Sequence, residues 1–500
     1  MVKALYSGLE IVYFSIAKPR LMKRFTLPLI ILLSFLSGGP SIAGQSPNII
    51  FIIGDDISWD DIGAYGNKKV KTPHLDKMAR EGMLFRNVFL TASSCSPSRT
   101  SILTGRYPHN TGAAELHTPL PAHLSYFPES LRQRGYFTAL AGKWHEGAFT
   151  KRAYDTLLVD RQLNGDGGEG QWLNLLNSRP AGKPFFFWLA PFDAHRPWSS
   201  GTPAVHNPDS EVEVPPNLAD SEETRKDLAK YYDEISRLDG HIGALIGELE
   251  RQKIADNTLI IFTSDNGRAF PGSKTRLYDA GLKTPFIVRW PAGITSGQSC
   301  GSLVSSIDIA PTLLELAGAV IPASVQGKSF AGLFADPAQA FRKFVFAEHN
   351  WHDYAAYERS VRSVSFLYIV NKRTGLDNGG PIDANQSPSA ASLKAARPAL
   401  TRLQNDVFLK PRPAEELFDN RQDPAQSVNQ AGNRKYAGTL DELRTVLRQW
   451  QLETGDTEPE HLTPDWYDRE NGQALPAKGK RGEMPGSAKK ADLINEKGPF

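Results

Sequence analysis

Four short apolar runs, each followed at once by charged or imidazole side chains, constrain the fold of this chain more than any other feature. They span residues 48–53, 137–141, 185–190 and 259–262. An uninterrupted apolar run of this length is typical of a strand that is buried on both faces of a sheet. We therefore expect these four segments to be interior strands of one large sheet.

Stretches with helical spacing of apolar residues alternate with these runs, for example at 77–81, 128–134 and 228–252. This alternation predicts an α/β fold in which helices sandwich a large, mainly parallel mixed sheet. In such folds ligands bind beyond the carboxyl ends of the strands. The polar groups that follow the four runs are therefore expected to converge on one site.

Carboxylate and amide side chains follow two of the runs. Asp55 and Asp56 come after the first run, and Asp265 and Asn266 come after the fourth. Neighbouring carboxylates repel one another unless a cation lies between them. Ligands that offer only oxygen suit Ca²⁺ and argue against Zn²⁺. These four residues therefore predict a site for one calcium ion.

The overall composition excludes several classes of protein. Hydrophobic residues make up 40% of the 500 residues, which is enough for a large core and rules out wholesale disorder. The formal net charge is only +2, which argues against a protein that binds nucleic acid through its overall field. Two cysteines, Cys95 and Cys300, are too few for a disulfide scaffold or a zinc cluster.

The N-terminal segment resembles an export signal. Basic residues at 22–24 precede an apolar run at 25–36, and small residues follow up to Gly44. The apolar run is too short to span a membrane, and no later stretch is long enough. We predict cleavage near Ala43 or Gly44, export to the periplasm or the medium, and a true start that could be Met22.

Three further regions follow the export signal of residues 1–44. Residues 45–365 are expected to form the catalytic domain. Residues 366–455 are expected to form a smaller domain with an antiparallel sheet and one helix, whose apolar stripe is Leu440, Leu443, Leu447 and Trp450. Residues 456–500 form a polar tail that we expect to be mobile.

Cys95 opens the segment Cys-Ser-Pro-Ser-Arg-Thr-Ser-Ile-Leu-Thr-Gly-Arg, which ends at Arg106. Pro97 suits the first turn of a helix and Gly105 suits its C-terminus. Cys95 would then lie at a helix N-terminus, where anions are favoured, with Arg99 one turn later. Taken alone, the pattern indicates a thiolate of low pKa, for which His145 or His195 could serve as the partner base.

This segment resembles the signature of the type I sulfatases, a family within the alkaline-phosphatase-like superfamily. Further matches are Asp55-Asp56, the 142–145 and 194–197 segments, the 264–267 segment and Lys274, so that the resemblance covers about 47–455. It implies that a maturation enzyme oxidises Cys95 to formylglycine, and that residue 95 joins Asp55, Asp56, Asp265 and Asn266 around one Ca²⁺.

The resemblance also implies a role for each catalytic candidate. A hydroxyl of the formylglycine hydrate would attack sulfur in line with the leaving group. Arg99, Lys143 and Lys274 would surround the sulfate oxygens and stabilise the charge of the transition state. His195 would protonate the leaving group, and His145 would deprotonate the remaining hydroxyl so that sulfate is expelled.

Within the family, the 264–278 segment, Arg362 and the 449–456 segment are most similar to the sulfamidase (heparan N-sulfatase) branch. This similarity implies a sulfated saccharide substrate with N-sulfoglucosamine. One departure is Lys274, because sulfamidases can carry Arg there whereas Lys is usual in other sulfatases. An O-sulfatase of glycans or aryl sulfates is therefore the alternative.

Two further functions stay open. A phosphodiesterase or phosphonate hydrolase of the same fold is disfavoured by Cys95, because phosphate enzymes usually carry Thr or Ser there. A non-catalytic glycan-binding protein is disfavoured by the complete set of metal and sulfate residues.

Residues outside the sulfate core are candidates for sugar recognition, and oligomeric state is left open. The polar and aromatic segment 348–353 could bind a sugar ring and its hydroxyls, and two loop histidines are further candidates. These substrate-binding candidates are His117, His123, Glu348, His349, Trp351 and His352. With Cys95 assigned to catalysis, Cys300 is expected to be unpaired, and no intramolecular disulfide is expected.

Overall fold

The four predicted strands are neighbours at the centre of an eight-stranded sheet. We describe a computed structural model of the chain over residues 46–377 and 380–500. The order across the sheet is β5-β4-β6-β1-β7-β8-β2-β9. The pairs from β5 to β7 are parallel, whereas β8 runs antiparallel to both β7 and β2. This confirms the predicted large, mainly parallel mixed sheet. The predicted export signal lies outside the described residues.

The strands of the large sheet are short, as buried apolar runs predict. In chain order they are β1 (Asn48–Gly54), β2 (Met83–Phe85), β4 (Phe137–Gly142), β5 (Thr156–Leu158), β6 (Phe185–Ala190), β7 (Thr258–Ser264), β8 (Phe286–Arg289) and β9 (Gln298–Cys300). A two-stranded parallel sheet joins β3 (Val88–Phe89) to β10 (Val304–Ser305).

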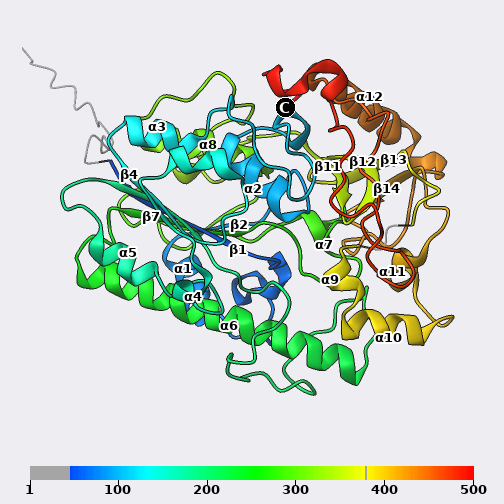
Figure 1. Ribbon diagram of the computed structural model, residues 1–500, viewed down its shortest axis with the longest axis horizontal. Coiled ribbons are helices and arrows are strands. Elements are labelled where there is room, and N and C mark those ends of the chain that lie inside the picture. The colour runs from blue at the N-terminus through cyan, green and yellow to red at the C-terminus, as the bar shows by residue number, and fades with distance from the viewer. Residues whose placement is uncertain (1–45, 378–379) are drawn as a thin grey trace, which may run out of the picture. The chain divides into compact units, whose positions relative to one another are not determined.

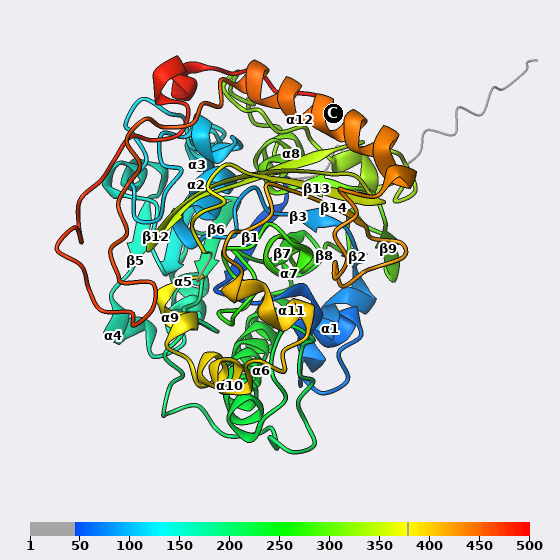
Figure 2. The same cartoon turned by 90° about the vertical axis from the view of Figure 1, so that its right-hand side faces the viewer.

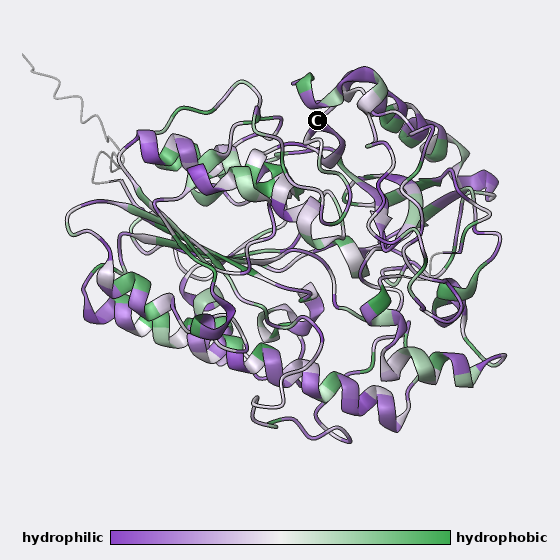
Figure 3. Cartoon of the chain, viewed as in Figure 1, coloured by the Kyte–Doolittle hydropathy of each residue, from purple (hydrophilic) through white to green (hydrophobic). Residues whose placement is uncertain are grey.

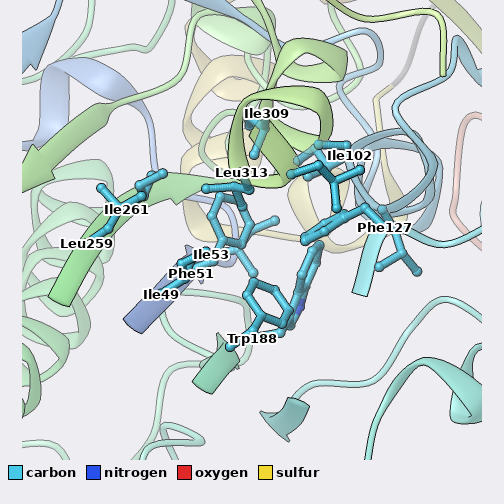
Figure 4. Packing of buried hydrophobic residues seen from close by; sticks show 14 of the residues in the cluster. Ile49, Phe51, Ile53, Ile102, Phe127, Trp188, Leu259, Ile261, Ile309 and Leu313 are labelled. Atoms are coloured by element: carbon cyan, nitrogen blue, oxygen red, sulfur yellow. The ribbon is translucent and has the colours of Figure 1, made fainter. Parts of the chain in front are cut away.

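Helices cover both faces of the large sheet (Figure 1). Successive side chains of a strand point to opposite faces, so β1 contributes to two cores. Ile49, Phe51 and Ile53 pack with residues of α2 (Cys95–Thr104), α3 (Phe127–Gln133) and α8 (Ile309–Leu316) (Figure 4). Ile50 and Ile52 pack with residues of α1 (Pro73–Glu81), α5 (Trp172–Ser178) and α6 (Glu222–Arg251). Burial on both faces explains why the central strands are mainly apolar (Figure 3).

The predicted helices are present, with somewhat different ends. The three that the sequence indicated are α1 (Pro73–Glu81), α3 (Phe127–Gln133) and α6 (Glu222–Arg251). The other helices of this region are α2 (Cys95–Thr104), α4 (Arg161–Asn164), α5 (Trp172–Ser178), α7 (Asp279–Leu282) and α8 (Ile309–Leu316). Ser221 caps the N-terminus of α6, because its side chain accepts a hydrogen bond from the Thr224 amide.

A four-stranded antiparallel sheet forms the second part of the fold. Its strands are β11 (Val345–His352), β12 (Tyr354–Arg362), β13 (Phe366–Asn371) and β14 (Glu415–Asp419), in that order. The boundary predicted at 365 is therefore misplaced, because it separates β12 from its partner β13. The boundary is predicted where the composition becomes polar and Pro-rich, and this change does not coincide with an edge of the sheet.

Helix α12 (Ala437–Thr454) covers one face of this sheet, as Figure 2 shows. The predicted stripe of Leu440, Leu443, Leu447 and Trp450 is buried against it. The Trp450 ring stacks on Phe346 of β11 with 5.0 Å between centroids. Between β13 and β14 the chain forms α9 (Ile382–Asn385), α10 (Pro388–Ala396) and α11 (Arg402–Asn405).

The expectation of a mobile tail is wrong, because residues 456–500 pack on the rest of the fold. Arg106 is fully buried and donates hydrogen bonds to the carbonyl oxygens of Asp492 and Ile494. The Trp466 ring lies 4.6 Å from that of Trp351. A polar composition did not reveal these contacts, because they use backbone carbonyls and isolated aromatic side chains.

Both cysteines are buried and free. Cys300 ends β9, and its thiol is shielded from water. Over the described ranges, no helix combines the length and the apolar character that crossing a membrane requires.

Phe51→Ala should lower the free energy of unfolding by about 3–5 kcal/mol, because it leaves a cavity in a fully buried core. The Phe51 ring lies 5.0 Å from that of Trp188. The Leu452→Ala variant is the control. Leu452 is 73% exposed, so this change should alter the free energy of unfolding by less than about 0.5 kcal/mol. Urea unfolding of the two variants measures the difference, and equal losses would contradict the packing described.

Candidate active site

Parallel pairing of β1 and β7 brings the predicted calcium ligands together. Gly54 is in register with Ser264, so the residues that follow each strand meet at one edge of the sheet. The Asp56 amide donates a hydrogen bond to Oδ1 of Asp265 at 3.2 Å. Asp56 itself has a φ of 62°, which turns the chain sharply after the strand.

Three carboxylates and one thiol converge at this edge. A ligand atom from each of Asp55, Asp56, Cys95 and Asp265 lies within 4.8 Å of the others. Sγ of Cys95 is 3.8 Å from Oδ1 of Asp55 and 4.0 Å from Oδ1 of Asp56. All four side chains are buried, so their charges interact with little screening by water.

Three cations face the carboxylates. Nε of Arg99 donates to Oδ2 of Asp265 at 2.8 Å, and Nζ of Lys274 lies 2.8 Å from Oδ1 of Asp56. Lys143 forms an ion pair with Asp55. The structure thus brings together Arg99, Lys143 and Lys274, which the sequence assigned to sulfate binding.

These charges shift the pKa values of the carboxylates in opposite directions. Burial would raise the pKa of Asp55, but Lys143, His195 and Arg99 outweigh it and hold that pKa well below its usual range. Burial and the neighbouring charge of Asp55 raise the pKa of Asp265 to about 6. A cluster in which one carboxylate resists ionisation is suited to a further cation.

The oxygen atoms of the cluster fit a calcium ion. Oδ1 of Asn266 is buried and has no hydrogen-bond partner within the described residues, although its amide nitrogen donates to Asp56. An unpartnered oxygen beside three carboxylates is what a hard cation would satisfy. Asp55, Asp56, Asp265 and Asn266 would hold the ion, which would supply positive charge next to residue 95.

Cys95 begins α2, as predicted, and Arg99 follows one turn later. Gly105 ends the helix with a φ of 65°, a left-handed conformation that favours glycine. The predicted low-pKa thiolate is wrong, however. Burial, with contributions from Asp265 and Asp55, raises the pKa of the Cys95 thiol well above its usual range. The unmodified thiol would therefore be a weak nucleophile.

The two histidines that the sequence suggested for proton transfer have different partners. His195 is partly exposed, and Nδ1 donates to the carbonyl oxygen of Arg196, which leaves Nε2 3.8 Å from Oδ2 of Asp56. His145 is also half-buried, and desolvation of its ring together with Lys143 lowers its pKa well below the usual value. Its Nε2 is 2.7 Å from Nδ1 of His117. A neutral His145 can accept a proton.

A cavity of about 570 Å³ opens onto these groups. Such a volume is in the range of small-molecule sites. Its wall includes Lys143, His145 and His195 together with residues from α4 and α6. Residues that line it include Asp55, His117, Lys143, His145, Arg161, Asp166, Phe192, His195, Ser199 and Arg237.

The structure separates the predicted sugar-binding residues into three groups. His117 lines the cavity, whereas His123 pairs with Asp492 at 3.2 Å and is not among the residues that line it. Glu348 is fully buried and pairs with His109 at 2.8 Å, so its carboxylate is not available to a sugar.

The remaining three candidates lie on β11 and are also buried. Trp351 is 1% exposed and donates to the Pro464 carbonyl oxygen, so the prediction that its ring stacks on a sugar is wrong. His352 contacts Oγ of Ser94 at 2.7 Å, just before α2. His349 is shielded by the same sheet, and burial with Arg276 lowers its pKa to about 3. The polar and aromatic segment 348–353 is therefore mostly a buried strand and not an exposed loop.

Sequence reasoning missed Asp383. Its Oδ2 lies 3.5 Å from Nζ of Lys274 and 3.6 Å from Nε2 of His195. Asp383 is in the polar, Pro-rich stretch between β13 and β14, where no apolar run or motif marks it. Only the path of the chain places it beside the strand ends.

Ca²⁺ should raise the melting temperature of chelator-treated protein, because an ion bound only by the folded cluster stabilises it. At 100 times its dissociation constant the gain is about 2.7 kcal/mol. Asp265→Asn should remove most of this shift. Asp441→Asn, whose side chain is 72% exposed, is the control and should keep it. An unchanged melting temperature in the parent protein would contradict the calcium site.

Two family models match the chain. The model named Sulfatase matches residues 47–169 and 170–319, which is more than half of the chain. The model named N-sulphoglucosamine sulphohydrolase, C-terminal, matches residues 272–372. The second match covers Lys274 and most of the antiparallel sheet.

Curated relatives agree with these models. Human N-sulphoglucosamine sulphohydrolase is 31% identical over 464 residues, which cover 82% of this chain and 90% of the relative. An ulvan-active sulfatase of Formosa agariphila is 29% identical and covers 82% of this chain and 76% of the relative. Human N-acetylgalactosamine-6-sulfatase is 29% identical over 57% of this chain and 64% of the relative.

Solved structures share the fold. A putative sulfatase of Bacteroides fragilis has a TM-score of 0.65 at 20% identity, covering 82% of this chain and 97% of that one. A structure described as a complex with its substrate D-glucosamine-2-N,6-O-disulfate has a TM-score of 0.64 at 21% identity, covering 82% and 98%. With the matched signature around Cys95, these similarities show that the chain belongs to the sulfatase family and is a sulfuric ester or sulfamate hydrolase.

Proposed function

We propose that this sulfatase removes the N-linked sulfate of N-sulfoglucosamine in a sulfated saccharide. The observation that carries the proposal is the match of residues 272–372 to the C-terminal model of N-sulphoglucosamine sulphohydrolase. That segment contains Lys274 and begins just after the metal cluster. The 31% identity to the human enzyme over 82% of the chain supports the same substrate.

Residue 95 acts as formylglycine in this proposal, made by a maturation enzyme from Cys95. When formed, the aldehyde hydrate supplies the hydroxyl that attacks sulfur, and bound calcium supplies positive charge. Cys95 is 3% exposed, so the reacting centre lies at the base of the site and away from bulk water. Exclusion of water strengthens each charge interaction there.

Arg99, Lys143 and Lys274 bind the three sulfate oxygens. The terminal nitrogens Nη1 and Nη2 of Arg99 are buried and have no hydrogen-bond partner among the described residues. They can therefore donate to a sulfate oxygen or to the oxygen atoms on residue 95. Lys143 and Lys274 supply point charges on two other sides.

The histidines move protons on opposite sides of the sulfur. Nε2 of His195 donates a proton to the leaving group, and the hydrogen bond from Nδ1 to the Arg196 carbonyl oxygen holds the ring in place. Nδ1 of His145 is buried without a hydrogen-bond partner within the described residues and accepts a proton near residue 95. The low pKa of His145 keeps its imidazole neutral for this role.

An O-sulfatase of glycans is the second candidate, because Lys274 is the residue that most sulfatases outside the sulfamidase branch carry. Human N-acetylgalactosamine-6-sulfatase is similar at 29% identity. A phosphonate monoester hydrolase of Silicibacter pomeroyi has a TM-score of 0.62 at 21% identity, which shows the shared fold alone. Export of the enzyme through the signal at residues 1–44 is part of the proposal.

Cys95→Ala should lower kcat/KM by about 10³-fold or more, because it removes the nucleophile. Mass spectrometry of the peptide that contains residue 95 should show formylglycine in the active parent enzyme. Cys300→Ala is the matched control and should keep the parent activity. Active protein that carries only the unmodified thiol would refute the formylglycine mechanism.

The parent enzyme should hydrolyse N-sulfoglucosamine with a kcat/KM at least about tenfold above those for 6-O- and 2-O-sulfated sugars, a difference of about 1.4 kcal/mol in transition-state stabilisation. Release of sulfate from each sugar measures the ratio. The Cys95→Ala protein corrects for contaminating activity. A higher value on an O-sulfated sugar would favour the second candidate.

A further inference from the structure

Asp383 brings a carboxylate to the leaving-group side of the site. It lies on α9, and its Oδ2 is 3.6 Å from Nε2 of His195 and 3.5 Å from Nζ of Lys274. Its side chain is 21% exposed, compared with 34% for His195 and 1% for Lys274. The carboxylate therefore lies between a buried lysine and an imidazole that is open to solvent.

We propose that Asp383 is a specificity-determining residue that favours an amine over an alcohol as the leaving group. Its carboxylate accepts a hydrogen bond from the ammonium group of the product. The inference rests on the proposed function, since it concerns the bond to the glucosamine nitrogen.

The direction in which the amine leaves sulfur brings it close to Asp383. Residue 95 is buried beside Asp55 and Asp56 at the base of the site, and His195 lies on the cavity wall. A group that leaves sulfur on the side away from residue 95 moves toward His195. Asp383 is next to that imidazole, so it is also next to the departing atom.

Local hydrogen bonds hold α9 in this orientation. The Ile382 amide donates to Oδ2 of Asp353 at 3.0 Å, at the start of the helix. Oδ1 of Asp383 accepts from the Ala384 amide at 2.7 Å. These contacts leave Oδ2 facing His195 and Lys274.

Asp383 shares its lysine with a second carboxylate. Lys274 is nearer to Asp56, at 2.8 Å, than to Asp383, at 3.5 Å. One ammonium group thus faces two carboxylates, and Asp383 is the more distant of them. Burial would raise the pKa of Asp383, but Lys274 and His195 outweigh it and hold the pKa well below its usual range.

The two leaving groups differ in the charge that they acquire. Hydrolysis of a sulfamate breaks S–N, forms S–O and converts R–NH–SO₃⁻ and water into R–NH₃⁺ and SO₄²⁻. Both protons of the water end on nitrogen. Hydrolysis of a sulfate ester gives a neutral alcohol, sulfate and a free proton. Only the amine product is a cation, and a carboxylate binds a cation by a charge-assisted hydrogen bond.

Asp383→Asn should therefore weaken the enzyme on amine-bearing molecules. We expect kcat/KM on N-sulfoglucosamine to fall about 10- to 100-fold, the size of one charge-assisted hydrogen bond. The inhibition constant of glucosamine should rise by a similar factor, whereas that of glucose, with a hydroxyl in place of the amine, should stay within about twofold. The Asp383→Glu variant should retain the preference for glucosamine.

Asp166→Asn is the matched control. Asp166 lines the cavity onto which His195 opens, and it accepts a hydrogen bond from Oγ of Ser199 at 2.7 Å. This variant also removes one negative charge, but it should leave the ratio of the glucosamine and glucose inhibition constants unchanged.

The outcomes separate the two proposals. A parent enzyme that hydrolyses O-sulfated sugars but not N-sulfoglucosamine overturns the proposed function and this inference with it. A parent enzyme that hydrolyses N-sulfoglucosamine but binds glucosamine no more tightly than glucose overturns only the inference, and this measurement needs no variant. An Asp383→Asn variant that still binds glucosamine more tightly than glucose, by the same factor as the parent enzyme, also overturns only the inference.

Discussion

Three carboxylates that are shielded from water, at the ends of two adjacent strands, set the main constraint on this structure. Buried charges of one sign are costly unless opposite charges lie close to them. Arg99, Lys143 and Lys274 supply those charges from three different segments of the chain. The active site is therefore an ionic cluster whose members depend on one another, and the surrounding fold has to hold them all in place.

The second part of the fold contributes to this burial. Trp351 of β11 packs in one cluster with Cys95 and Leu116, and Trp466 of the C-terminal segment packs against it. Arg481 lies over both tryptophan rings, at 4.6 and 4.7 Å from their centroids, and donates to the Leu116 carbonyl oxygen. Trp351, which the sequence suggested for sugar binding, instead helps to keep water away from Cys95.

Much of the candidate site could be predicted to come together because its residues directly follow buried strands or lie in a dense motif. Asp55, Asp265 and Lys143 are examples, since parallel strands bring their carboxyl ends to one edge. The residues that surround the cavity beyond the strand ends could not be predicted in this way. Asp383 lies in a polar stretch without periodicity, and the polar segment 348–353 has the same composition whether it is exposed or packed.

The sequence by itself determined the α/β class, the convergence of four strand ends and the sulfatase signature, because apolar runs and local motifs depend on neighbouring residues. Only the tertiary structure decided that the thiol of Cys95 is too buried to ionise readily, that Trp351 lies behind the site and that Asp383 joins His195. These properties depend on distances between segments far apart in the chain, which burial and charge pairing set only when the chain is folded.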